Sequence, residues 1–121
     1  MDWSKIKHFK PEEFTCRCGC GQNDMNHQFV AALDLAREKS GVTFHVASGF
    51  RCADHNAKCG GVGDSAHTRG YAADILVHGS QNRMQVMRAL LAYFNRVGVY
   101  GTFIHCDVDP DKPAGVMWVG K

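Results

Sequence analysis

The sequence contains no apolar run that approaches the roughly 20 residues needed to cross a bilayer. Its formal net charge of +2 over 121 residues is too small to indicate nucleic acid as the main partner. Residues 1–10 mix Asp, Lys, His and Trp, unlike a secretory signal, so synthesis in the cytoplasm is expected. Internal repeats and long linkers are also absent from the sequence, and its length fits one compact domain over residues 1–121.

The six cysteines leave several interpretations open. Cys16, Cys18 and Cys20 form a tight run, and the others are scattered at positions 52, 59 and 106. Without a secretory signal, reduced thiols are favoured at synthesis. We expect a structural role, either as buried thiols or as disulfides formed after release. A second metal site at the Cys-x-Cys-x-Cys run is the alternative, although paired zinc ligands usually have two to four residues between them.

Hydrophobic periodicity predicts an α+β domain. Residues 26–40 and 80–95 have helical spacing, and the second of these helices is expected to bury Met84, Met87, Leu91 and Phe94. Residues 9–14 and 53–58 indicate short helical segments. Strands are predicted over residues 43–48, 71–77, 97–100, 102–108 and 116–119. These elements predict a single small domain with a mainly antiparallel sheet and helices packed on one side of it.

Three side chains of the zinc-ligand type lie at predicted strands or their edges, namely His67, Asp74 and His105. Asp74 stands inside an apolar strand, where a carboxylate is unfavourable by several kcal/mol unless it is paired or bound to metal. Two imidazoles and one carboxylate leave a fourth zinc position open, which is typical of catalytic zinc that activates a water and polarises a carbonyl. The alternative is that Asp74 pairs with an arginine and both histidines are ordinary polar residues.

Several motifs surround these residues. They are Ser-Gly-Phe-Arg at 48–51, His-Asn at 55–56, Gly-Gly at 60–61, Ser-Ala-His-Thr-Arg-Gly-Tyr-Ala-Ala-Asp at 65–74, and Phe-Ile-His-Cys-Asp-Val at 103–108. Together they resemble the zinc D-alanyl-D-alanine carboxypeptidase family, whose hedgehog/DD-peptidase fold is shared by the metal-binding half of hedgehog domains. More narrowly, they resemble the small branch of phage endolysins and murein endopeptidases. The segment 9–21, Phe-Lys-Pro-Glu-Glu-Phe-Thr-Cys-Arg-Cys-Gly-Cys-Gly, is also similar to the phage members. The resemblance covers nearly the whole chain, and the Ser-x-His…Asp…His set is its most specific part.

The resemblance implies one zinc ion per chain. The ligands that it implies are His67, Asp74 and His105. It also implies that Arg51 holds a substrate carboxylate, with an ion pair to Asp54 or Asp64 as the structural alternative. Ser65 matches the serine before the first histidine of the family, which binds substrate or fixes the loop. Trp118 is similar to a C-terminal tryptophan of related members, either packing under the site or stacking on substrate.

The general base is where the sequence departs from the family. Many members carry an acidic residue three positions before the last histidine, and here that position is Thr102. Asp107 follows His105 by two residues on the same strand face, and we predict it to be the base. Orientation of a zinc ligand is its alternative role. His55 and Tyr100 are further candidates.

The resemblance therefore implies a zinc metallopeptidase that hydrolyses stem peptides or cross-links of bacterial peptidoglycan, as a DD-carboxypeptidase/endopeptidase or an L-Ala-D-Glu endopeptidase. A monomeric phage or prophage lytic enzyme is expected, acting at the cell wall or periplasm after phage-mediated release. The peptidoglycan peptide is its expected partner, without nucleic acid or a membrane span. Two alternatives are open. One is a zinc-containing wall- or protein-binding module without turnover, and the other is zinc bound by the cysteines alone.

Overall fold

The computed structural model describes residues 2–120, and all structural statements concern this part of the chain. Its helices are α1 (His27–Ser40), α2 (Ala53–Lys58) and α3 (Gly79–Tyr93). Its strands are β1 (His45–Ser48), β2 (Ala72–Leu76), β3 (Arg96–Val99), β4 (Phe103–Asp107) and β5 (Val116–Val119). Short 3-10 helices are η1 (Trp3–Lys5), η2 (Pro11–Phe14) and η3 (Ala66–Arg69).

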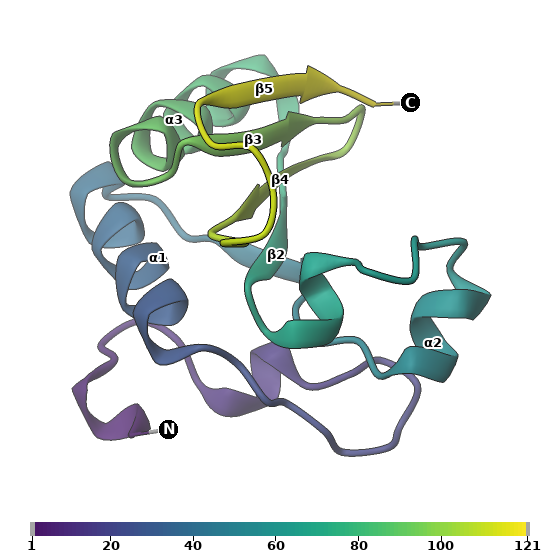
Figure 1. Ribbon diagram of the computed structural model, residues 1–121. Coiled ribbons are helices and arrows are strands. Elements are labelled where there is room, and N and C mark those ends of the chain that lie inside the picture. The colour runs from purple at the N-terminus through teal and green to yellow at the C-terminus, as the bar shows by residue number, and fades with distance from the viewer. Residues whose placement is uncertain (1, 121) are drawn as a thin grey trace.

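The strands form one mixed sheet in the order β1-β2-β4-β3-β5. Neighbouring strands run antiparallel except β3 and β5, which run parallel. Figure 1 shows α1 and α3 next to each other on one side of the sheet, with α2 apart from both. The arrangement confirms the predicted α+β fold, and the parallel β3–β5 pair makes the sheet mixed.

Alternation along β2 and β4 separates the core from a polar face. Ala73 and Ile75 of β2 and Ile104 and Cys106 of β4 belong to the hydrophobic core and are almost completely buried. Successive side chains of a strand point to opposite faces, so the residues between them face the other way. On β4 these include His105 and Asp107, and on β2 the central one is Asp74. The core side of the sheet thus supports a polar cluster on its opposite side.

Helix α1 has a capping residue at each end. The side-chain oxygen of Asn26 accepts a hydrogen bond of 2.9 Å from the backbone N–H of Phe29, which is the usual N-cap contact. Gly41 ends the helix at φ 69°, a left-handed conformation that glycine adopts without a Cβ clash. The helix buries Phe29, Val30, Leu33 and Ala36. The predicted helix at 26–40 is therefore confirmed.

Helix α3 turns a different face to the core than the one predicted. Met84 and Leu91 are exposed by 58% and 49%, whereas Val86, Ala89 and Leu90 are buried. The α3 sequence carries two overlapping apolar stripes, the predicted one and one formed by Val86, Ala89 and Leu90. Packing against α1 buries the stripe with Val86, Ala89 and Leu90. Of the four residues predicted to be buried, only Phe94 is deeply buried. Its ring packs against that of Phe29, with the ring centres 5.5 Å apart.

Gly70 joins the start of β2 to the segment before α1, and its substitution should destabilise the fold. Its φ is +76°, and an added Cβ would lie 2.1 Å from the carbonyl oxygen of Asp24. We expect Gly70→Ala to lower the free energy of unfolding by at least about 1 kcal/mol, measured by urea denaturation. Gly63→Ala is the matched control, because nothing lies within 4 Å of its Cβ position. Equal stability of the two variants would contradict this prediction.

Among the described residues, none of the helices combines the length and apolar character needed to span a membrane.

Candidate metal centre

Local structure brings the three predicted zinc ligands together. His67 lies in η3, where the Ser65 hydroxyl accepts a hydrogen bond of 3.3 Å from the His67 backbone N–H. Asp74 and His105 are directly opposite each other in the antiparallel β2–β4 pair. Directly paired residues point to the same face of a sheet, so this register places both side chains side by side.

The donor atoms of these three residues all lie within 4.8 Å of one another. Asp74 Oδ1 is 3.0 Å from His105 Nδ1 and 3.3 Å from His67 Nε2. His67 and Asp74 are buried, and His105 is half-buried at the edge of the cluster. Two imidazoles and one carboxylate that converge in this way are a donor set that zinc uses, so these residues can hold one metal ion.

Hydrogen bonds on the far side of each ring select the nitrogen that faces the centre. His67 Nδ1 is 2.8 Å from the carbonyl oxygen of Gly49, which can only accept, so Nδ1 carries the proton and Nε2 keeps its lone pair. His105 Nε2 is 2.7 Å from Asp107 Oδ2, so Nε2 is the donor and Nδ1 faces Asp74. Contacts of this kind fix the tautomer and orientation of metal-binding histidines.

The charges of the cluster shift its pKa values in opposite directions. Burial acts to raise the pKa of Asp74, but hydrogen bonds with His105 and His67 outweigh it and hold that pKa well below its usual range. Burial acts to lower the pKa of His105, but the carboxylates of Asp107 and Asp74 outweigh it and raise that pKa. Asp74 is therefore ionised over the whole neutral range, while a proton competes with any metal ion for His105.

Asp107 contacts His105, and it is also held by Arg96 and by a backbone N–H, two contacts that the sequence did not indicate. Its Oδ1 accepts hydrogen bonds from Arg96 Nε at 2.7 Å and from the backbone N–H of Asp109 at 3.1 Å. Its Oδ2 contacts His105, and the residue is 1% exposed. Burial acts to raise the pKa of Asp107, but these contacts with His105 and Arg96 lower it. The predicted base role of Asp107 stays a prediction, although both of its oxygens are already engaged.

A cavity of about 390 Å³ opens beside the three donors. Its lining includes Arg51, Ser65, Tyr100, Lys112 and Trp118. The cavity therefore offers cationic, hydroxyl and aromatic groups next to the candidate metal centre.

Arg51 forms its ion pair with Asp74, whose Oδ2 is 3.3 Å from the Arg51 guanidinium. The alternative partners suggested by the sequence, Asp54 and Asp64, form no such pair among the described residues. Arg51 Nε also donates to the hydroxyl of Ser48 at 3.1 Å. The guanidinium is thus fixed at the cavity wall beside the metal donors.

The remaining candidates fall in different places. Trp118 packs with its ring centre 5.4 Å from that of His105, and its indole N–H donates to the Tyr100 hydroxyl at 3.0 Å. Tyr100 thus lies at the cavity, whereas His55 lies on α2 beside the cysteine run. Thr102, at the position where the family that the sequence resembles often carries an acid, is exposed.

Arg69 and Asp109 form a further ion pair, in which the carboxylate is buried and the Arg69 side chain is half-buried. The Asp109 side chain is completely buried and also accepts a hydrogen bond of 3.0 Å from the backbone N–H of Asp111. Burial acts to raise the pKa of Asp109, but this backbone contact and Arg69 lower it. A lowered pKa means that the ionised carboxylate contributes stability above its unfolded-state pKa, and that this contribution is lost as the pH falls through the folded-state pKa.

We expect Asp109→Asn to lower the free energy of unfolding by about 2 kcal/mol at pH 7, because a charged hydrogen-bonded pair is lost. The difference from the wild type should begin to shrink as the pH falls below about 4, the pKa of the unfolded-state carboxyl, and should disappear only below the lowered folded-state pKa of Asp109. Urea denaturation at pH 7, 5 and 3 would measure both effects. Asp111→Asn is the control, since the Asp111 side chain is 78% exposed and should change stability little.

The described geometry agrees with one comparison to known proteins. The family model for Peptidase M15 matches residues 7–107, which is more than half of the chain and includes all three metal donors. No curated protein matches the chain.

Proposed function

The chain belongs to the peptidase M15 family and is therefore a hydrolase by family, and from this premise we propose that it is a zinc metallopeptidase of bacterial peptidoglycan. Its substrates would be the stem peptides or cross-links, and its zinc ligands His67, Asp74 and His105. The observation that carries the proposal is the convergence of these three donors beside a cavity that also holds Arg51.

Zinc held there would supply Lewis-acid polarisation of the scissile carbonyl and an activated water nucleophile. The remaining work belongs to side chains of the chain itself. Arg51 lines the cavity with a guanidinium already fixed by Ser48, so it can bind a carboxylate of the stem peptide without a large ordering cost. Ser65 caps η3 and so holds the backbone of His67 in place.

We assign Asp107 an orienting role within this proposal. Its Oδ2 accepts from His105 Nε2, and its Oδ1 is engaged by Arg96 and by a backbone N–H. A carboxylate with both oxygens engaged is well suited to fix the ring of a metal-binding histidine. It is poorly placed to take up a proton from the water that attacks the substrate. These contacts support the orienting role over the base role.

The proposal includes a phage or prophage lytic enzyme that acts at the bacterial cell wall after release. Its support is the resemblance of residues 9–21 to phage members of the family. Pocket shape decides which bond such enzymes cut. The test must therefore distinguish cleavage at D-Ala-D-Ala, at L-Ala-D-Glu and at the cross-link.

Digestion of purified peptidoglycan tests the proposal directly. The full chain is incubated with defined wall material, with zinc, with a chelator, and with zinc restored after chelation. Mass spectrometry of the soluble products should show peptides that appear only in the two zinc arms, and their ends identify the bond. If no peptide is released under any condition from protein with a full complement of zinc, the peptidase proposal is wrong.

One observation favours a second candidate function, a zinc-containing module that binds wall peptides without hydrolysis. Thr102 is exposed at the usual position of the acid, and Asp107 is fully engaged, so no free carboxylate replaces it at these two positions. Pull-down on the same insoluble wall material measures binding independently of product release. Zinc-dependent retention without soluble peptides would establish this second function.

A further inference from the structure

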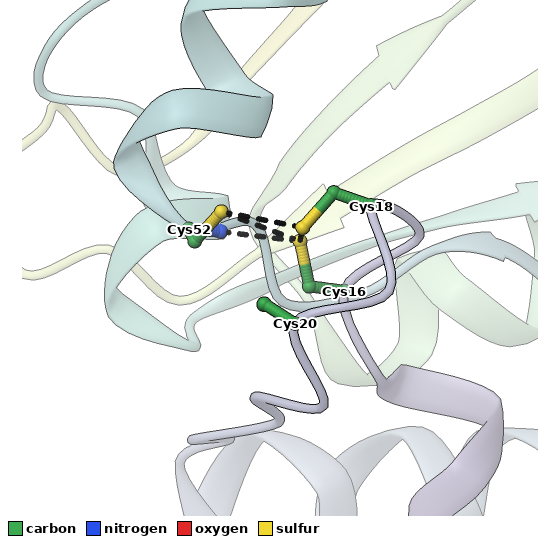
Figure 2. Close-up of side chains that lie close together, drawn as sticks. All are labelled: Cys16, Cys18, Cys20 and Cys52. Carbon is green, nitrogen blue, oxygen red and sulfur yellow. Dashed lines mark hydrogen bonds between the residues drawn. The ribbon is translucent and has the colours of Figure 1, made fainter.

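A second group of potential metal donors lies outside the site described above. Cys16, Cys18 and Cys20 come from the loop after η2, and Cys52 is the N-cap residue of α2. Their four sulfur atoms all lie within 4.8 Å of one another. Figure 2 shows Cys16 and Cys18 pointing toward Cys52, with Cys20 beside them on the same loop. Segments 36 residues apart in the chain therefore meet at a single cluster of thiols.

The distances within the cluster match metal coordination better than a disulfide. The sulfur atoms of Cys16, Cys18 and Cys52 are separated by 3.5, 3.6 and 3.7 Å. A tetrahedral zinc site with Zn–S bonds of about 2.3 Å places its sulfur atoms about 3.8 Å apart. A disulfide would join two of them at about 2.05 Å and leave the others unpaired. Three nearly equal separations instead describe one face of a tetrahedron, with Cys20 available for the fourth corner.

Local backbone structure builds this cluster despite its short spacing. Gly19 and Gly21 have φ values of +92° and +80°, conformations that few other residues adopt. The backbone N–H of Cys16 donates to the carbonyl of Gln22 at 2.8 Å and closes the loop. These turns bring Cys18 and Cys20 to the same side although only one residue separates them.

Backbone N–H groups also point at the sulfur atoms. The N–H of Cys52 donates to Cys16 Sγ, and the N–H of His55 donates to Cys52 Sγ, both at 3.4 Å. Donors of this kind stabilise negative charge on sulfur, which a cluster of thiolates around a cation requires.

We propose that Cys16, Cys18, Cys20 and Cys52 bind one zinc ion as a structural tetrathiolate site, separate from the centre formed by His67, Asp74 and His105. Four protein ligands leave no open coordination position, so the site would stabilise structure and perform no chemistry. Among the interpretations left open by the sequence, the arrangement favours a second metal site over disulfides.

The cysteine site lies where it can connect the N-terminal loop to the segment that carries Arg51. Cys52 directly follows Arg51, whose backbone N–H donates to the carbonyl of His67 at 3.2 Å. The preceding residue, Phe50, donates to the carbonyl of Phe14 at 2.9 Å. A metal ion at the cysteines would therefore tie the N-terminal loop to the segment that carries Arg51, and so hold the wall of the cavity in place.

Zinc content and cobalt spectra test the proposal in the full chain, produced with zinc and purified without oxygen. The wild type should contain two zinc ions per chain, and Cys18→Ser and Cys52→Ser about one each. Cys59→Ser is the matched control, because Cys59 is exposed and outside the cluster, and it should retain both ions. His67→Ala should retain the ion at the cysteines and lose the other.

Cobalt provides a readout that does not require a cysteine variant to fold. Cobalt-loaded wild type and His67→Ala should both show intense thiolate-to-cobalt charge-transfer absorption, because the four cysteines supply sulfur ligands whereas His67, Asp74 and His105 supply nitrogen and oxygen. Absence of that absorption from both proteins, or a disulfide within the cluster of the anaerobically purified protein, would overturn the proposal. Neither readout depends on hydrolysis, so an inactive protein with the cobalt–thiolate spectrum would contradict only the peptidase proposal.

Discussion

Substitution of Asp74 by asparagine is expected to remove zinc from the His67–Asp74–His105 centre and to reduce peptidoglycan hydrolysis about 1,000-fold or more. Asparagine keeps the size of the side chain but loses the charge that faces both histidines and Arg51. A catalytic zinc ion contributes several kcal/mol to the stabilisation of the transition state. At about 1.4 kcal/mol for each tenfold change in rate, a loss of about 4 kcal/mol corresponds to this factor.

Zinc content, zinc affinity and the rate of peptide release should all be measured on this variant. Asp64→Asn is the matched control, because Asp64 is exposed and accepts hydrogen bonds from Arg69 and Lys112 through its backbone oxygen. It should behave as the wild type in each assay. Thermal unfolding of both variants separates loss of metal from loss of fold. Near-normal hydrolysis by a folded Asp74→Asn variant would show that the metal centre is not the catalytic site.

The sequence was most informative about Asp74, because a carboxylate inside an apolar strand requires a partner. The prediction that Asp74 and the two histidines share one site needed the family resemblance, since the pairing of β2 with β4 depends on the whole sheet. The register that sets Asp74 opposite His105 is a tertiary contact, and alternation along each strand alone does not determine it.

The orienting contact of Arg96 was missed for a related reason. An arginine beside Val97 at the start of a strand is equally compatible with an exposed edge. Only the pairing of β3 with β4, which sets Val97 opposite Cys106, brings Arg96 close to Asp107. The buried face of α3 was likewise decided by packing against α1, since the sequence contains two overlapping stripes.

The cysteines illustrate the limit of spacing rules. The short Cys-x-Cys-x-Cys run argued against a zinc site, because the usual rule counts residues along the chain. The structure adds Cys52 from a distant segment, and two glycines with positive φ fold the run around the same point. Neither the long-range contact nor the loop conformation can be obtained from the spacing itself.

Substitution of Asp107 by asparagine separates its two possible roles. If Asp107 orients His105, the variant should bind zinc about 10- to 100-fold more weakly and hydrolyse substrate more slowly in proportion at limiting zinc. The pKa of His105 is raised largely by its contact with Asp107, so it should fall in the variant. Because protonated His105 cannot bind metal, the zinc affinity of the wild type should begin to fall as the pH drops through this raised pKa, whereas the weaker affinity of the variant should begin to fall only at a lower pH.

If Asp107 is instead the general base, the opposite result is expected for zinc affinity and for the rate at saturating zinc. Zinc affinity at neutral pH would then be unchanged, and the rate with saturating zinc would fall by about 100- to 10,000-fold with a changed pH profile. Calorimetric zinc titrations between pH 5 and 8, combined with rates at saturating zinc, distinguish the two cases. Asp111→Asn, on an exposed side chain two residues beyond Asp109, is the matched control. Because both Asp107 oxygens are held by Arg96, His105 and a backbone N–H, we expect the loss to appear in zinc affinity.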